Sequence, residues 1–125
     1  MVTPTEIAQL LGECNTWKEV LRSQREDLNQ LKAQLTGSAA KENSKDILLE
    51  IEHLDNQFHI QLINIHDLKH NIKNHERKLE SENTSGSVSN ELLAVHENLL
   101  DEYTDLNNTI DDLKSEYEHF QMQTI

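Results

Sequence analysis

Three long stretches of the chain carry apolar residues at alternating spacings of three and four. Because an α-helix has 3.6 residues per turn, this spacing places the apolar side chains on one stripe, and such helices pack along their stripes as coiled coils. In the first stretch the stripe comprises Ile7, Leu10, Cys14, Trp17, Leu21, Gln24, Leu28, Leu31 and Leu35. The pattern predicts an all-α protein.

The first helix is predicted over residues 4–36. Thr3 provides a capping hydroxyl, Pro4 suits the first helical position, and Glu6 stands three residues after the cap, where its carboxylate reaches back to the cap amide. Gly37 follows the stripe, and glycine readily adopts the left-handed conformation that ends many helices. We therefore expect the first helix to end there.

The remaining stripes predict a second helix over residues 39–81 and a third over 88–121. Their core positions are Ile47, Ile51, Leu54, Phe58, Gln61, Ile65, Leu68, Ile72, His75 and Leu79 in the second, and Leu92, His96, Leu99, Tyr103, Leu106, Ile110, Leu113, Tyr117 and Phe120 in the third. Residues 38–44 suit either a loop or the first turns of the second helix, and two alanines there favour helix. Residues 82–87 have the small, polar composition of a mobile loop.

Three long amphipathic helices with two short connections pack as an antiparallel, up-down-up three-helix bundle with coiled-coil crossings. The 125 residues suit a single rod-shaped domain, and three glycines and one proline are too few for the turns of a β-sandwich or barrel. Gln24 and Gln61 are expected to fix the register of the helices. The arrangement resembles a spectrin-like repeat, a likeness that extends to Trp17 within the first helix. This resemblance concerns architecture and implies no site residue.

Charge and cysteine content restrict the location and the partners. The chain has 23 acidic and 11 basic residues, a net charge of -12, so direct nucleic-acid binding is disfavoured because phosphate backbones would be repelled. Residues 1–6 lack a secretory signal pattern, and no apolar run reaches the roughly 20 residues of a membrane span. Cys14 is the single cysteine and cannot form an intrachain disulfide, so we expect a cytoplasmic protein.

No catalytic motif is recognisable, and we predict a protein that is not an enzyme and has no cofactor. Glu-x-x-His motifs on facing helices hold metal ions in some bundles. Glu50 with His53 and Glu116 with His119 have this spacing. The stripe places both histidines outside the core, so we expect no metal centre there.

Two further pairs of histidines lie in the second and third helices. His66 and His70 have a chelating spacing but fall on the solvent side, where a hydrated polar face is the simpler interpretation. His75 and His96 occupy core positions, and antiparallel pairing brings them to nearly the same level, beside the frayed start of the first helix. We expect a neutral, hydrogen-bonded pair at a half-wet end of the bundle, with a metal site or a pH switch as the alternative.

The second helix contains a charge-free segment at residues 56–66. We expect pairing to bring it level with two other uncharged segments, 14–17 and 106–110, so that a neutral belt surrounds the middle of the rod. Exposed apolar side chains surrounded by amides without charge have the composition of a protein interface. The candidate interface residues are Leu49, Ile60 and Ile63, which project away from the core stripe, and Trp17 at the edge of the belt.

The acidic residues concentrate in the third helix. Residues 87–125 contain nine acidic side chains against one basic side chain, Lys114, whereas residues 1–37 contain five against four. The candidate residues of this face are Glu97, Asp101, Asp105, Asp111, Asp112, Glu116 and Glu118, which all fall off the core stripe. They form either a solubilising face or a surface that binds a basic protein.

These features predict a non-enzymatic coiled-coil interaction or scaffold module whose partner is a protein, either a second copy or an unknown one. We expect self-association, and hence a homo-oligomer, through the charge-free belt of the second helix. The first alternative is that the acidic third helix binds a basic protein partner. The second alternative is a metal-binding or enzymatic helical bundle.

Overall fold

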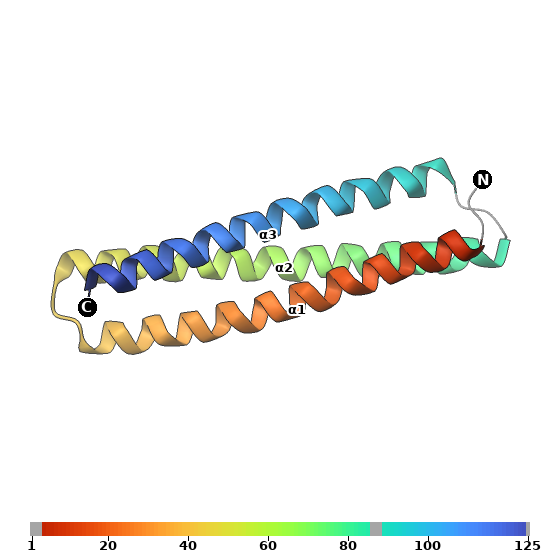
Figure 1. Cartoon of the computed structure of the whole chain (residues 1–125). Coiled ribbons are helices and arrows are strands. Elements are labelled where there is room, and N and C mark those ends of the chain that lie inside the picture. Colours follow the sequence, from red (N-terminus) through yellow and green to blue (C-terminus); the bar gives the residue numbers. More distant parts are fainter. Residues whose placement is uncertain (1–3, 86–88, 125) are drawn as a thin grey trace.

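The computed structural model describes residues 4–85 and 89–124, which form three long helices. They are α1 (Pro4–Lys41), α2 (Lys45–Ser85) and α3 (Asn90–Thr124), and they run alternately up, down and up along a rod (Figure 1). The described residues contain no strand. No apolar stretch in these helices is long enough to cross a membrane. The predicted all-α, antiparallel three-helix bundle is therefore confirmed.

The first helix continues beyond the glycine at which we expected it to end. Gly37 lies inside α1, and its backbone lacks the left-handed conformation of a helix cap. Ala39 packs against the hydrophobic core just beyond it, and this burial stabilises the added turn as helix. Residues 39–41 therefore belong to α1 and not, as predicted, to the second helix.

Ser44 determines where α2 begins. Its hydroxyl accepts a hydrogen bond from the amide of Ile47 at 3.5 Å, and its carbonyl accepts one from the amide of Leu48 at 3.0 Å. The carboxylate of Glu42 accepts the amide of Ser44 itself at 2.9 Å. Serine at this position satisfies amides that the first turn of a helix leaves unpaired. The first connection is consequently the short segment 42–44.

The second connection also differs from the prediction. α2 extends to Ser85, so residues 82–85 are helical rather than part of a mobile loop. Residues 86–88, which include the rest of the predicted loop and the predicted start of the third helix, lie outside the described residues. α3 is described from Asn90 and ends at Thr124 rather than at residue 121.

Ser89, just before α3, forms hydrogen bonds with both α2 and α3. The hydroxyl of Ser89 accepts the amide of Leu92 at 3.2 Å and so caps α3. Its backbone amide donates to the carboxylate of Glu82, on α2, at 2.9 Å. The last turns of α2 are thereby tied to the neighbouring helix.

The hydrophobic core follows the three predicted stripes. Its buried members are Ile7, Cys14, Trp17, Leu21, Leu28 and Leu35 of α1, Ile51, Leu54, Phe58, Ile65, Leu68, Ile72 and Leu79 of α2, and Leu92, Leu99, Ile110, Leu113, Tyr117 and Phe120 of α3. Burying one such large apolar side chain contributes roughly 1.5–3 kcal/mol. The core therefore runs along the whole rod and leaves the opposite face of each helix in solvent.

Two ion pairs define how far α1 is shifted along α2. Lys18 lies 2.7 Å from Glu76, and Lys32 lies 2.8 Å from Asp55. Residues 14–17 are therefore near the level of Glu76, and they are not beside the 56–66 segment as we had expected. The reason is that α1 ends at Lys41 and not at residue 36, so the turn to α2 comes later. In an antiparallel pair, each residue added before the turn places a given residue of the first helix opposite a residue further along the second.

Gln24 connects α1 to α3 within the core. Its side-chain amide donates to the Asn107 carbonyl at 3.3 Å, and its carbonyl accepts a hydrogen bond from the Lys114 ammonium. Lys114 also lies 2.9 Å from Asp27 of α1. Gln61 differs, because the bond described for it is to a side chain of its own helix. Of the two buried glutamines, Gln24 is the one whose described bonds join two helices.

Gly37 provides a direct test of the extended α1. A Cβ atom at this position would meet nothing within 4 Å, and alanine is more favourable than glycine in an exposed helix by roughly 0.5–1 kcal/mol. We expect Gly37→Ala to raise the free energy of unfolding, measured by urea denaturation, by about that amount. Gly12→Ala, also inside α1 and also in open space, is the matched comparison. A loss of stability at 37 alone would indicate a left-handed helix end there.

Candidate functional site

Three chemically versatile side chains, one from each helix, meet inside the bundle. Cys14 of α1, His75 of α2 and His96 of α3 have exposed fractions of 0%, 2% and 5%. His75 Nε2 lies 2.9 Å from His96 Nδ1, and Cys14 Sγ lies 4.0 Å from the same nitrogen. One ligand atom from each residue lies within 4.8 Å of the others. We call these three residues the Cys–His cluster.

Glu13 orients the His96 ring. His96 Nε2 donates to the Glu13 carboxylate at 2.6 Å. A neutral imidazole has one N–H group and one lone pair, so Nδ1 of His96 then faces the cluster as an acceptor. His75 Nε2 is the donor to it, which leaves a lone pair on His75 Nδ1. That nitrogen is buried and has no hydrogen-bond partner among the described residues.

Aromatic rings pack against the cluster. The centroid of the Trp17 ring lies 4.8 Å from that of His96 and 5.7 Å from that of Tyr103. Trp17 and Cys14 are three residues apart, so the stripe that buries one also buries the other. The rings keep the surroundings of the cluster apolar, and electrostatic interactions are stronger in such surroundings than in water.

Burial keeps two members of the cluster uncharged at neutral pH. It lowers the pKa of His75 from 6.5 to about 4, with smaller contributions from His96 and Lys78. Burial, together with the smaller effects of the Glu76 and Glu13 carboxylates, raises the pKa of the Cys14 thiol from 9.0 to about 12. The thiol is therefore not a reactive thiolate in this structure.

The environment of the histidines differs from the one we expected. His75 and His96 do lie at one level, but they are buried rather than half-wet, and Cys14, well inside α1, is beside them. The signal for Cys14 was its place on the apolar stripe, and the sequence offered no comparable signal for Glu13. Connecting either residue with the pair required the alignment of α1 with α3, which depends on both connections.

The candidate interface residues separate into two groups. Leu49, Ile60 and Ile63 have exposed fractions of 54%, 39% and 47% on the side of α2 away from the core. We call these three residues the outer ridge. Trp17 does not belong with them, because it is 6% exposed and packs beneath the surface against His96. At the level of residues 56–66 the expected belt therefore lacks the α1 segment 14–17, whereas Leu106 and Thr109 of the α3 segment line one pocket with Gln61 and Asn64 of α2.

The seven candidate carboxylates of α3 are all exposed, and we call them the acidic face. Glu116 lies 3.7 Å from His53, and Asp111 accepts a hydrogen bond from Gln24 at 3.5 Å. The other five form no ion pair within residues 4–85 and 89–124: Glu97, Asp101, Asp105, Asp112 and Glu118. The basic residue of this helix, Lys114, is directed to α1 and leaves the acidic face uncompensated.

The remaining histidines considered as metal ligands lie on the surface. His53 is paired with Glu116 in solvent, with side-chain exposures of 57% and 54%, and His119 is exposed as well. His66 and His70 are also exposed, at the solvent-facing positions expected for them. These side chains therefore do not form an enclosed site.

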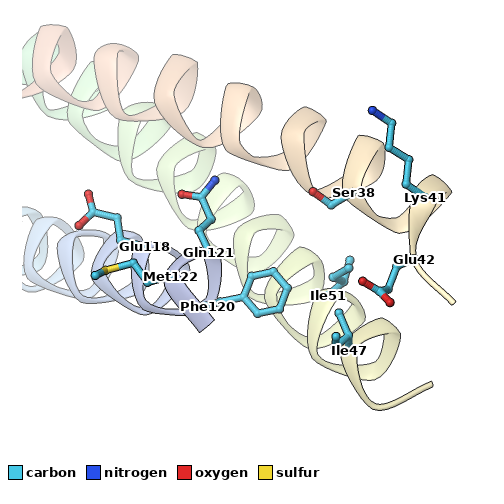
Figure 2. A pocket seen from close by; sticks show the side chains of 9 residues that line it. All are labelled: Ser38, Lys41, Glu42, Ile47, Ile51, Glu118, Phe120, Gln121 and Met122. Atoms are coloured by element: carbon cyan, nitrogen blue, oxygen red, sulfur yellow. The ribbon is translucent and has the colours of Figure 1, made fainter. Parts of the chain in front are cut away.

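A pocket of about 620 Å³ opens where α1 ends, α2 begins and α3 ends (Figure 2). The ring of Phe120 points toward Ile51, and Lys41 points away from the opening. The carboxylate of Glu42 in its wall accepts the Ser44 amide of the first connection. Because its charged groups serve the turn or face solvent, we assign no function to this pocket.

Acid should destabilise the bundle through His75. Its pKa is about 4 in the folded protein and about 6.5 in an unfolded chain, so the folded state binds the proton more weakly. The stability that His75 contributes above pH 6.5 is therefore lost as the pH falls through this range toward 4, by about 3 kcal/mol in all. Urea unfolding at successive pH values in metal-free buffer measures this loss.

Two double variants separate the buried pair from exposed histidines. Replacing both residues of the pair, His75→Leu and His96→Leu, should flatten the pH dependence because no buried imidazole remains to be protonated. His66→Leu with His70→Leu changes the same number of histidines at exposed positions and should leave the profile unchanged. A cluster variant that is as acid-sensitive as the original chain would show that His75 is not the source.

No protein-family model, no curated protein and no solved structure matches this chain. Within its described residues, the Cys–His cluster, the outer ridge and the acidic face are the candidate functional sites.

Proposed function

We propose that the chain is a non-enzymatic helical interaction module that self-associates through the outer ridge of α2. The observation that carries the proposal is the exposure of Leu49, Ile60 and Ile63 on a helix face that contributes nothing to the core. Three large apolar side chains in solvent on one face are typical of a surface that a partner covers. A cytoplasmic location is part of the proposal and is supported by the single, unpaired Cys14.

The order of residues along α2 supports a linear interface. Residues 49, 56, 60 and 63 are separated by seven, four and three positions, so they follow one line along the helix. In an antiparallel arrangement of two copies, the same line on each helix would face its counterpart, as twofold symmetry requires. Because each side chain of the outer ridge is already about half buried, covering it contributes about half of the 1.5–3 kcal/mol of full burial, so six such side chains in a dimer support a weak, reversible association.

The distribution of charge favours α2 over α3 as the face through which two copies would meet. Two chains that each carry a net charge of -12 repel one another, most strongly where their acidic residues approach. Residues 56–66 contain no acidic or basic side chain, whereas the exposed Val95 and Leu100 of α3 lie among carboxylates. Two copies can therefore approach through α2 with the least repulsion.

Lysine substitutions in the outer ridge test self-association. Ile60→Lys with Ile63→Lys removes two apolar contacts and adds like charges, so we expect the dimer to weaken about 100-fold or more in sedimentation equilibrium. The matched control is Val95→Lys with Leu100→Lys, which changes two equally exposed apolar residues on α3. The control should retain self-association, and circular dichroism should show helical structure in both variants.

Two results would contradict the proposal. A chain that remains monomeric at millimolar concentration has no self-interface of this strength. Equal weakening in both lysine variants would mean that net charge, and not the outer ridge, governs association.

The uncompensated acidic face supports a second function, the binding of a basic protein. Five of its carboxylates have no ion pair among the described residues, and Lys114 is directed to α1. Affinity of this kind rests on long-range charge attraction and decreases as salt screens it. Its salt dependence distinguishes it from the apolar contact of the outer ridge.

A charge-matched pair of variants tests the acidic face. Glu97→Gln, Asp101→Asn and Asp105→Asn together should weaken binding to a polylysine probe about tenfold at low salt, since each lost surface charge contributes up to about 1 kcal/mol. Glu26→Gln, Glu50→Gln and Glu80→Gln remove the same charge from exposed positions on α1 and α2. Equal weakening in both triple variants would indicate an effect of net charge without a defined face.

A further inference from the structure

The Cys–His cluster has a composition that a helical interaction module does not require. An apolar core residue at each of its three positions would avoid burying polar atoms, one of which has no hydrogen-bond partner among the described residues. We propose that Cys14, His75 and His96 bind one Zn²⁺ ion, with water as the fourth ligand. The proposal does not depend on self-association, because the cluster lies inside the bundle and the outer ridge lies on its surface.

The donor atoms suit zinc. Zn²⁺ is held in proteins by cysteine sulfur and histidine nitrogen, and sites with three protein ligands keep a fourth position for water. Here one sulfur and two nitrogens come from three different helices, so the backbone of the bundle holds them together. The surface histidines have no buried sulfur beside them and lack this arrangement.

The distances are close to those of a tetrahedral site. Bond lengths of about 2.3 Å to sulfur and about 2.0–2.1 Å to nitrogen place two nitrogens about 3.3 Å apart and a sulfur and a nitrogen about 3.6 Å apart. The nitrogens of His75 and His96 are 2.9 Å apart, and Cys14 Sγ is 4.0 Å from His96 Nδ1. All three ligand atoms lie within 4.8 Å of one another. The nitrogen–nitrogen and sulfur–nitrogen separations therefore each differ by about 0.4 Å from those of a tetrahedral zinc site, and binding requires the three side chains to adjust.

Glu13 acts as a positioning residue for this ion. Histidine ligands commonly donate their second N–H to a carboxylate, which fixes the tautomer and the ring orientation and makes the other nitrogen a better donor. His96 Nε2 already donates to Glu13 at 2.6 Å, so the lone pair of Nδ1 is directed into the cluster. Glu13, whose side chain remains partly in solvent, thus orients Nδ1 of His96 toward the ion.

The unpartnered nitrogen of His75 can take up the proton that zinc binding displaces from the same ring. His75 Nε2 now carries the proton that it shares with His96, and this atom has to release it to coordinate the ion. Nδ1 of the same ring has no partner and accepts that proton, which changes the tautomer without changing the charge of His75. Cys14 loses its thiol proton to solvent. Binding of one Zn²⁺ therefore releases one proton and places one thiolate on the ion.

The local charges favour a cation in place of the thiol proton. The carboxylates of Glu13 and Glu76 create a negative potential at Cys14 Sγ. Lys18 acts in the opposite direction but lies 2.7 Å from Glu76 and is largely offset by it. Counting Lys18, a divalent ion beside one thiolate and the two carboxylates makes the group neutral overall, so it is more compatible with a buried site than an isolated thiolate.

Titration of the whole chain with Co²⁺, a spectroscopic substitute for Zn²⁺, tests the site. We expect a thiolate-to-cobalt charge-transfer absorption that saturates at one ion per chain and disappears when Zn²⁺ is added. Cys14→Ser should abolish the absorption. His66→Gln with His70→Gln should retain it in full, because these ligands are exposed and lie outside the cluster.

Glu13→Gln separates a positioning role from a merely structural one. It should weaken Zn²⁺ binding about 10–100-fold, the usual effect of losing such a carboxylate, while the charge-transfer absorption persists at saturating Co²⁺. Glu26→Gln, an exposed change on the same helix, should leave the affinity unchanged. Circular dichroism in the presence of a chelator checks that each variant is folded before metal is added.

Three outcomes would overturn the proposal. One is the absence of charge-transfer absorption in the folded chain at millimolar Co²⁺. Another is an absorption that persists in Cys14→Ser. The third is a number of bound ions per chain that decreases when the surface residues His66 and His70 are replaced. If Cys14→Ser does not fold, His96→Asn serves in its place, because it removes a ligand nitrogen and leaves the sulfur.

Discussion

Burial of one apolar stripe per helix is the interaction on which the rest of this structure depends. The hydrophobic effect has no direction along the helix axis, so the stripes hold the helices side by side but permit them to slide. Directional contacts remove this freedom. Gln24 with Asn107 aligns α1 with α3, Lys18 with Glu76 aligns α1 with α2, and the two buried histidines align α2 with α3. The stripe supplies most of the stability, and these contacts define the register.

The same register assembles the Cys–His cluster. Each of its residues occupies a core position of its own helix, and a polar group at such a position costs stability unless it is paired. Both ring nitrogens of His96 form hydrogen bonds, whereas only one ring nitrogen of His75 does so among the described residues. If the three residues bind an ion, metal binding is the reason why these core positions carry polar groups that lower stability. The predicted acid sensitivity and the proposed zinc site consequently concern one place in the bundle.

The two proposed binding surfaces lie on different helices and differ in physical character. The outer ridge of α2 is apolar, and its Ile60 and Ile63 lie in a segment without charge, whereas the acidic face of α3 is charged and largely uncompensated. Salt weakens charge attraction and leaves apolar contacts nearly intact. The two proposed surfaces do not overlap, so the proposed self-association and the proposed binding of a basic protein are compatible with one another.

The sequence by itself determined the fold class, the stripe positions and the exposure of Ile60 and Ile63, because helical periodicity is a local property. It also indicated that His75 and His96 lie at one level, since the connection between their helices is short. Only the tertiary structure decided that Cys14 and Glu13 join them and that Trp17 is buried beside them. The physical reason is the first turn: Gly37 remains helical because Ala39 packs on the core, and this later turn determines which residues of α1 face the other two helices.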